Sequence, residues 1–169
     1  MATNAETLVV ITDANVLINL LRIGQLPLLG ALNPYRFLVP EEVLGEIIEP
    51  AQREETASAI TSGYLYRVVV DTMESLALFA ELRGVMGVGE AACLALATTM
   101  GCFIASDEKK RFRRRAIELI GEDRILRTES ILLEAIRQGR ISVAEADGFK
   151  AILEANRYLM PFGSFSDLV

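Results

Sequence analysis

Short apolar runs rich in β-branched residues alternate along this chain with longer segments whose apolar positions follow helical spacing. Strands that alternate with helices imply βαβ units, which build a mostly parallel sheet with helices on both faces. Because the runs are continuously apolar, the sheet should be buried on both sides. The sequence therefore predicts an α/β fold of three layers, α/β/α, with a central sheet of four to five strands. The expected strands are residues 8–11, 37–39, 68–70 and 102–105, with a weaker fifth at 124–127.

Proline and glycine mark the ends of several helical segments between these runs. Pro40 is at the start of an expected helix, a position that proline favours. Gly101 follows the end of another, at the C′ position that glycine favours. The chain has 169 residues, enough to bury its own core, so we expect a single domain over residues 1–169. The expected helices are residues 16–21, 40–48, 51–62, 91–100, 112–120, 129–138 and 142–155.

The chain contains no histidine, which narrows the chemistry it can perform. Ser-His-Asp and Cys-His catalysis are excluded. A metal site has to be built from carboxylates and other oxygens or from the two cysteines, and carboxylates select hard cations such as Mg²⁺ or Mn²⁺. The net charge of −6 argues against a dedicated duplex-binding protein, which needs a clear basic excess.

The two cysteines, Cys93 and Cys102, form no CxxC motif. We expect two buried, reduced thiols, as in a cytoplasmic protein. The first residues lack the basic region of a signal peptide. No apolar run approaches the roughly 18 residues of a transmembrane helix, so we expect no membrane span.

Acidic residues follow the predicted strands at the edge where open α/β sheets bind ligands. Asp13 follows the first strand, Asp107 follows the fourth, Glu90 opens a helix after the turn 87–89, and Glu46 lies in the helix expected after Pro40. Singly, each has an ordinary interpretation as an N-cap, a first-turn acid or a solvated residue. If the acids lie together, two carboxylates about 6 Å apart at an effective dielectric of about 20 repel each other by about 3 kcal/mol. A divalent cation turns this cost into affinity, so the cluster predicts an Mg²⁺ or Mn²⁺ site.

Basic residues are concentrated immediately after Asp107. Six of the seven residues at 109–115 are basic, so the rest of the chain carries a net charge of −12. Such a run is usually a solvated helix face, but beside a metal-binding acid it favours a polyanionic substrate. Asn15 and Ser106 could orient a carboxylate or a water, or could only cap a helix and satisfy a strand-end amide. The candidate substrate-binding residues are Lys109, Lys110, Arg111, Arg113, Arg114 and Arg115.

Four stretches, in order, resemble the motifs of the PIN-domain family, the metal-dependent ribonuclease fold that includes the VapC-type toxins. They are the opening strand with its D-x-N at 9–18, the P-x-x-V-x-x-E helix at 39–47, the G-E-A helix at 89–97 and the strand-end acid at 104–110. The similarity spans about residues 8–120, which we take as the metal-site core. The closing helices, at about 128–169, resemble a prokaryotic subgroup of the family.

The resemblance implies a PIN-like three-layer fold and metal-dependent hydrolysis of phosphodiester bonds in single-stranded RNA. Carried over to this chain, it makes Asp13, Glu90 and Asp107 the main metal-binding acids, with Glu46 completing the quartet. Many members have aspartate where this chain has Glu90. Glu108 is the alternative to Asp107, which we prefer for its place at the strand end. Because toxin members usually pair with an antitoxin and dimerise, the implied partners are RNA, an antitoxin and a second copy of the chain.

Two other functions fit parts of the pattern. A metal-dependent phosphatase or phosphotransferase would use Asp13 as its nucleophile. Such sites usually carry a second acid two residues on, where this chain has Asn15. A non-catalytic module could keep the fold as a protein or RNA platform, but it would have no reason to bear the repulsion of four acids. The leading hypothesis is the endoribonuclease, with Mg²⁺ or Mn²⁺ among the predicted acids.

Overall fold

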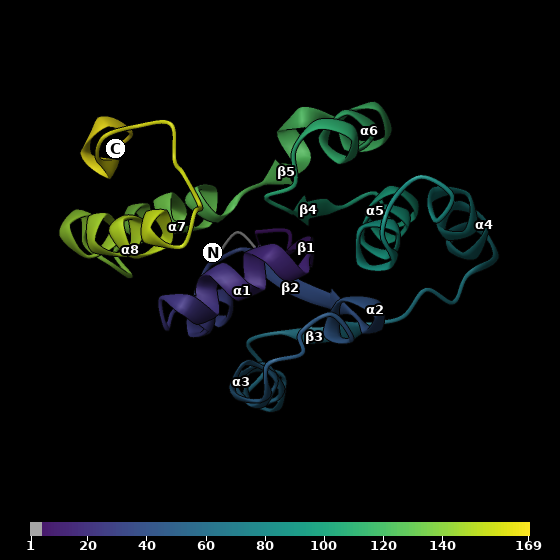
Figure 1. The fold of residues 1–169 in the computed structure, drawn as a ribbon, viewed down its shortest axis with the longest axis horizontal. Helices are drawn as coiled ribbons and strands as arrows, with labels where there is room; N and C mark the ends of the chain where they lie inside the picture. Colours follow the sequence, from purple (N-terminus) through teal and green to yellow (C-terminus); the bar gives the residue numbers. More distant parts are fainter. Residues whose placement is uncertain (1–4) are drawn as a thin grey trace.

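The computed structural model describes residues 5–169 and contains one parallel sheet (Figure 1). Its five strands lie in the order β3-β2-β1-β4-β5, and each neighbouring pair is parallel. β1 is central, and its Ile11 pairs with Leu38 of β2 and with Ile104 of β4. The predicted α/β fold is confirmed. The strands are β1 (Leu8–Thr12), β2 (Tyr35–Pro40), β3 (Tyr66–Val68), β4 (Phe103–Ala105) and β5 (Ile125–Leu126).

Helices cover both faces of the sheet. α1 packs against α3, α7 and α8, whereas α5 packs against α2, α4 and α6. In Figure 1, α7 and α8 lie to one side of the strands and α4 and α5 to the other. The helices are α1 (Ala14–Arg22), α2 (Glu41–Leu44), α3 (Pro50–Thr61), α4 (Met73–Leu82), α5 (Val88–Met100), α6 (Lys110–Ile120), α7 (Thr128–Arg137) and α8 (Val143–Ala155).

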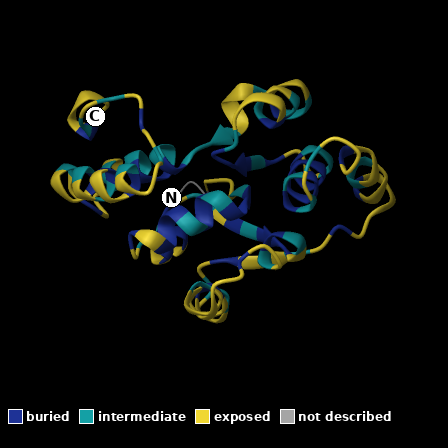
Figure 2. Ribbon diagram, viewed as in Figure 1, coloured by how far each residue is buried: buried dark blue, intermediate teal, exposed yellow. Residues whose placement is uncertain are grey.

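The core follows the sheet. The central strand residues Val10 and Ile11 are fully buried, and α5 contributes a run of small buried residues that packs on β1, β2 and β4. Figure 2 shows the buried strand residues in β1, β2 and β4, whereas the edge strand β3 and the outer sides of α3, α4 and α6 are largely exposed. Both cysteines are buried and unpaired, as predicted. Over residues 5–169, no helix is long and apolar enough to cross a membrane.

Three local features differ from the prediction. The helix expected over residues 40–48 ends at Leu44, because the chain tightens there into i→i−3 turns. Glu46 therefore lies in a turn, and Ile48 is 80% exposed. The strand expected at 68–70 forms at Tyr66–Val68, where β2 provides its partner. α4 is not among the helices predicted from the sequence, and its start is fixed by a capping box between Thr72 and Ser75.

Candidate functional site

Asp13 is the innermost acid of the candidate site and is only 3% exposed. It follows β1 and caps α1, with Oδ1 accepting the Ala14 backbone N–H at 2.8 Å. Its Oδ2 accepts the Ser106 hydroxyl, at the end of β4, at 3.1 Å. Its own N–H donates to the Ala105 carbonyl at 2.9 Å. The pairing of β1 with β4 therefore places this acid directly beside the loop that follows β4.

Glu46 reaches the site from the turn after α2. Its Oε1 accepts the backbone N–H of Gly89 at 2.9 Å. Gly89 lies in the first turn of α5, where unpaired N–H groups favour a carboxylate. A Cβ at position 89 would lie 2.5 Å from Glu46 Oε1, so a larger residue there would displace the Glu46 carboxylate. The sequence analysis marked Gly89 only as a turn residue, because its role depends on a segment 43 positions away.

Glu90 and Glu108 belong to the same group of acids, because the charges of these acids affect one another's pKa values. Burial raises the pKa of Asp13 to about 7, and the charges of Glu108 and Glu46 contribute to the rise. Burial is also the main cause that raises the pKa of Glu90, followed by the charge of Glu108 and, more weakly, that of Glu46. Four carboxylates therefore share one neighbourhood at the carboxyl ends of the strands. We call Asp13, Glu46, Glu90 and Glu108 the acid cluster.

Glu108 is held in the acid cluster by the two predicted supporting residues. Asn15 Nδ2 donates to Glu108 Oε1 at 2.9 Å, and the Ser106 hydroxyl accepts the Glu108 N–H at 3.2 Å. The same hydroxyl donates to Asp13, so one serine connects two acids of the cluster. Asn15 Oδ1 also accepts the Asp107 N–H at 3.2 Å. Asn15 and Ser106 thus contact the strand-end acids directly.

Asp107 belongs to a separate hydrogen-bond network. Its Oδ1 accepts the Thr128 backbone N–H at 2.8 Å and the Tyr158 hydroxyl at 2.7 Å. Its Oδ2 accepts Asn19 Nδ2 at 2.9 Å and the Thr128 hydroxyl. The Tyr158 phenol has one proton and also contacts Glu129, so Asp107 and Glu129 share this donor. The Asp107 side chain is therefore engaged by donors from α1, α7 and the segment after α8, whereas the Glu108 side chain binds Asn15 and its charge acts on Asp13 and Glu90.

The acid cluster has the donor chemistry that a hard cation requires, because all its side-chain ligands are oxygens. Among residues 5–169, no three acidic or thiol side chains already converge closely enough to hold an ion. Glu42 Oε2 is nevertheless buried and has no hydrogen-bond partner there. Burial raises the pKa of the Cys93 thiol well above its usual value, and the charges of Asp13, Glu46, Glu42 and Glu90 add to this. Uncompensated negative charge is thus concentrated at this edge, where Mg²⁺ or Mn²⁺ would neutralise it.

The basic run forms the start of α6, and internal partners occupy part of it. Within the part of the chain that the structure describes, Lys109, Lys110 and Arg114 are exposed and make no ion pair. Lys110 and Arg114 are four residues apart and so share one face of the helix. Arg111, Arg113 and Arg115 instead contact, in that order, the Val85 carbonyl, Glu122, and the pair Glu81 and Glu118.

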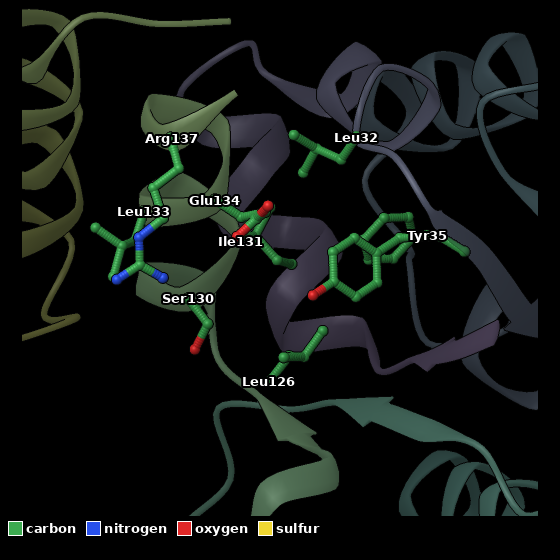
Figure 3. A pocket seen from close by; sticks show the side chains of 9 residues that line it. Leu32, Tyr35, Leu126, Ser130, Ile131, Leu133, Glu134 and Arg137 are labelled. Atoms are coloured by element: carbon green, nitrogen blue, oxygen red, sulfur yellow. The ribbon is translucent and has the colours of Figure 1, made fainter. Parts of the chain in front are cut away.

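A pocket of about 270 Å³ lies between α7 and the start of β2. Figure 3 shows the Tyr35 ring facing Ile131 and Glu134 across it. Burial is the main cause that raises the pKa of Tyr35, and the charge of Glu134 contributes. No residue of the acid cluster lines this pocket, which is therefore separate from the candidate site.

The family comparison matches most of the chain. Residues 9–161 match the family model DUF3368, described as a PIN domain. A search of curated proteins finds no match. The matched range contains the acid cluster and also Tyr158, so it extends over both the strand-end site and the two closing helices.

Proposed function

Since this chain belongs to the PIN-domain family, we propose that it is a metal-dependent endoribonuclease that hydrolyses phosphodiester bonds of single-stranded RNA. PIN domains are generally nucleases. The observation that carries the proposal is the acid cluster itself, because burial and mutual repulsion raise the pKa values of Asp13 and Glu90. This arrangement costs free energy unless a cation binds.

The residues that would hold Mg²⁺ or Mn²⁺ are Asp13, Glu90 and Glu108, with Glu46 as the fourth acid. Glu108 takes the place that the sequence favours for Asp107, because donors outside the acid cluster already engage both carboxylate oxygens of Asp107. When bound, the cation supplies Lewis-acid activation of water and of the phosphoryl group.

The remaining residues position the acids and the substrate. Ser106 fixes the relative positions of Asp13 and Glu108 through one hydroxyl. Lys110 and Arg114 follow the strand-end loop on one face of α6, where exposed cations can bind the RNA phosphates. We include Lys109 in this substrate-binding set, whereas the arginines with internal partners are less available to RNA.

A phosphatase with Asp13 as nucleophile has less support. Both carboxylate oxygens of Asp13 already accept hydrogen bonds, and the residue is almost fully buried. An attacking oxygen needs room for the phosphorus atom, which the burial of Asp13 does not provide.

Cleavage of a fluorescent, mixed-sequence single-stranded RNA by the purified protein tests the proposal. We expect cleavage with Mn²⁺, no cleavage with EDTA, and loss of cleavage to background in Glu108→Gln. The matched variant Asp107→Asn should keep metal-dependent cleavage at a reduced rate. Full activity in Glu108→Gln, or cleavage that survives EDTA, would refute the proposed site. Absence of both cleavage and Mn²⁺ binding would favour the non-catalytic module.

A further inference from the structure

Four side chains converge on the strand end from widely separated parts of the chain. Asp107 follows β4, Asn19 comes from α1, Thr128 begins α7, and Tyr158 follows α8. We call these four residues the strand-end latch. Thr128 is fully buried, and Asn19 and Asp107 are less than one-tenth exposed. A buried, fully hydrogen-bonded network of this kind holds its members in one arrangement.

Tyr158 is the member that the closing helices contribute. After α8 the chain reverses at Arg157, whose φ of +67° lies in the left-handed region that non-glycine residues rarely adopt. The Tyr158 N–H then bonds back to the Leu153 carbonyl at 2.9 Å. The phenol reaches both Asp107 and Glu129. Burial, the charge of Asp107 and the contact with Glu129 all raise the pKa of Tyr158, so its hydroxyl stays a proton donor.

The latch is connected to the acid cluster through adjacent backbone groups. The Asp107 N–H donates to Asn15 Oδ1, and the same asparagine holds Glu108 Oε1 through its Nδ2. The Glu108 N–H donates to Ser106, which also binds Asp13. Fixing the Asp107 side chain on one side of the loop therefore fixes the Glu108 side chain on the other.

We propose that the strand-end latch is a positioning device in which Tyr158, acting through Asp107, sets Glu108 in the acid cluster. The Mn²⁺-binding test of this inference rests on the proposed function. The inference assigns Asp107 and Tyr158 as positioning residues and gives the segment after α8 a role in the active site. Residues that hydrogen-bond to metal ligands and orient them typically change metal affinity by about 10- to 100-fold when they are altered.

The first test uses metal-free protein and does not depend on the nuclease proposal. Tyr158→Phe removes the hydroxyl that contacts both Asp107 and Glu129, and Tyr35→Phe, in the pocket of Figure 3, is the matched control. We expect amide hydrogen exchange at Glu108 to speed up by about fivefold or more in Tyr158→Phe, the effect of one lost hydrogen bond. Tyr35→Phe should leave it unchanged. Equal exchange in the two variants would overturn the latch.

The second test measures Mn²⁺ binding by calorimetry well below the unfolding temperature. Tyr158→Phe should weaken binding by about tenfold, and Thr128→Val, which removes the second hydroxyl on Asp107, should do the same. A purely structural role would lower the unfolding temperature of both variants and leave the Mn²⁺ affinity unchanged, which would overturn the latch alone. Absence of saturable Mn²⁺ binding in the wild-type protein would overturn the proposed function and the metal-positioning role together.

Discussion

Replacing Asp13 with asparagine should stabilise the metal-free protein while it removes the metal site. The Asp13 carboxylate is buried, and burial is the main cause of its raised pKa. Asparagine has nearly the same shape and is as good an N-cap as aspartate, so the hydrogen bond from the Ala14 N–H is retained. The substitution therefore removes the cost of a buried charge and leaves the packing in place.

The magnitude follows from the two pKa values of Asp13. An unfolded aspartate ionises with a pKa of 3.8, whereas folded Asp13 ionises with a pKa of about 7. Because the folded pKa is the higher one, the folded state favours the protonated acid. The contribution of Asp13 to stability is intact below pH 3.8 and is lost progressively as the pH rises to about 7. At 1.36 kcal/mol for each pKa unit, the loss is about 4 kcal/mol at pH 8 and about 2 kcal/mol at pH 5.

Urea unfolding of the wild type and Asp13→Asn at pH 5 and pH 8, both with EDTA, measures this difference. We expect the variant to be more stable at both pH values, with the larger gain at pH 8. Mn²⁺ should then stabilise the wild type at pH 8 and leave the variant unchanged. Asp107→Asn is the contrasting control. It replaces a carboxylate that accepts four hydrogen bonds, so it should lower stability at pH 8 by about 1–3 kcal/mol.

Two results would refute this reasoning. A gain in Asp13→Asn that is equal at pH 5 and pH 8 would mean that ionisation of Asp13 carries no cost in the folded protein. A destabilised Asp13→Asn variant at pH 8 would mean that the carboxylate charge is compensated by the protein itself, without a cation.

Three further predictions follow from the same geometry. Gly89→Ala should displace Glu46 and weaken Mn²⁺ binding by about tenfold. Gly87→Ala is the control, because a Cβ at position 87 would have no atom within 4 Å, and it should leave the affinity unchanged. Equal Mn²⁺ affinities of the two variants in calorimetry would exclude a role for the Gly89–Glu46 contact. Arg114→Ala should lower RNA affinity and reduce the salt slope of binding by about one, with an unaltered unfolding temperature; an unchanged slope in filter binding would remove Arg114 from the interface. Cys93 should resist iodoacetamide at pH 8 until urea unfolds the protein, because burial and the nearby acids keep the thiol protonated; rapid labelling of the native protein, read by mass spectrometry, would contradict this.

Much of the fold could be predicted because apolar periodicity is a local property and βαβ connections fix the direction of the strands. Continuous apolar runs indicate buried strands, and crossover helices force parallel pairing, so residues that end β1 and β4 must meet at one edge. The short β3 was displaced by two residues from its predicted position because its pairing with β2, and not its own valines, defines it. α4 escaped prediction because one face packs on α5 while much of the other is exposed.

The choice between Asp107 and Glu108 shows where sequence reasoning stops. Adjacent residues at the end of a strand point in different directions, and both are acidic here. Which of them enters the cluster depends on donors that lie far away in sequence, such as Tyr158, 51 positions from Asp107. Gly89 was similarly visible as a turn residue, but its contact with Glu46 could not be read from spacing.

The sequence by itself determined the α/β architecture, the histidine-free chemistry of any metal site and the edge of the sheet at which the acids gather, because each follows from composition or periodicity. The tertiary structure alone decided which four carboxylates share that edge and which acid is withdrawn into the latch. Hydrogen-bond donors from α1, α7 and the segment after α8 compete for the strand-end carboxylates, and the outcome depends on distances that exist only once the helices have packed on the sheet.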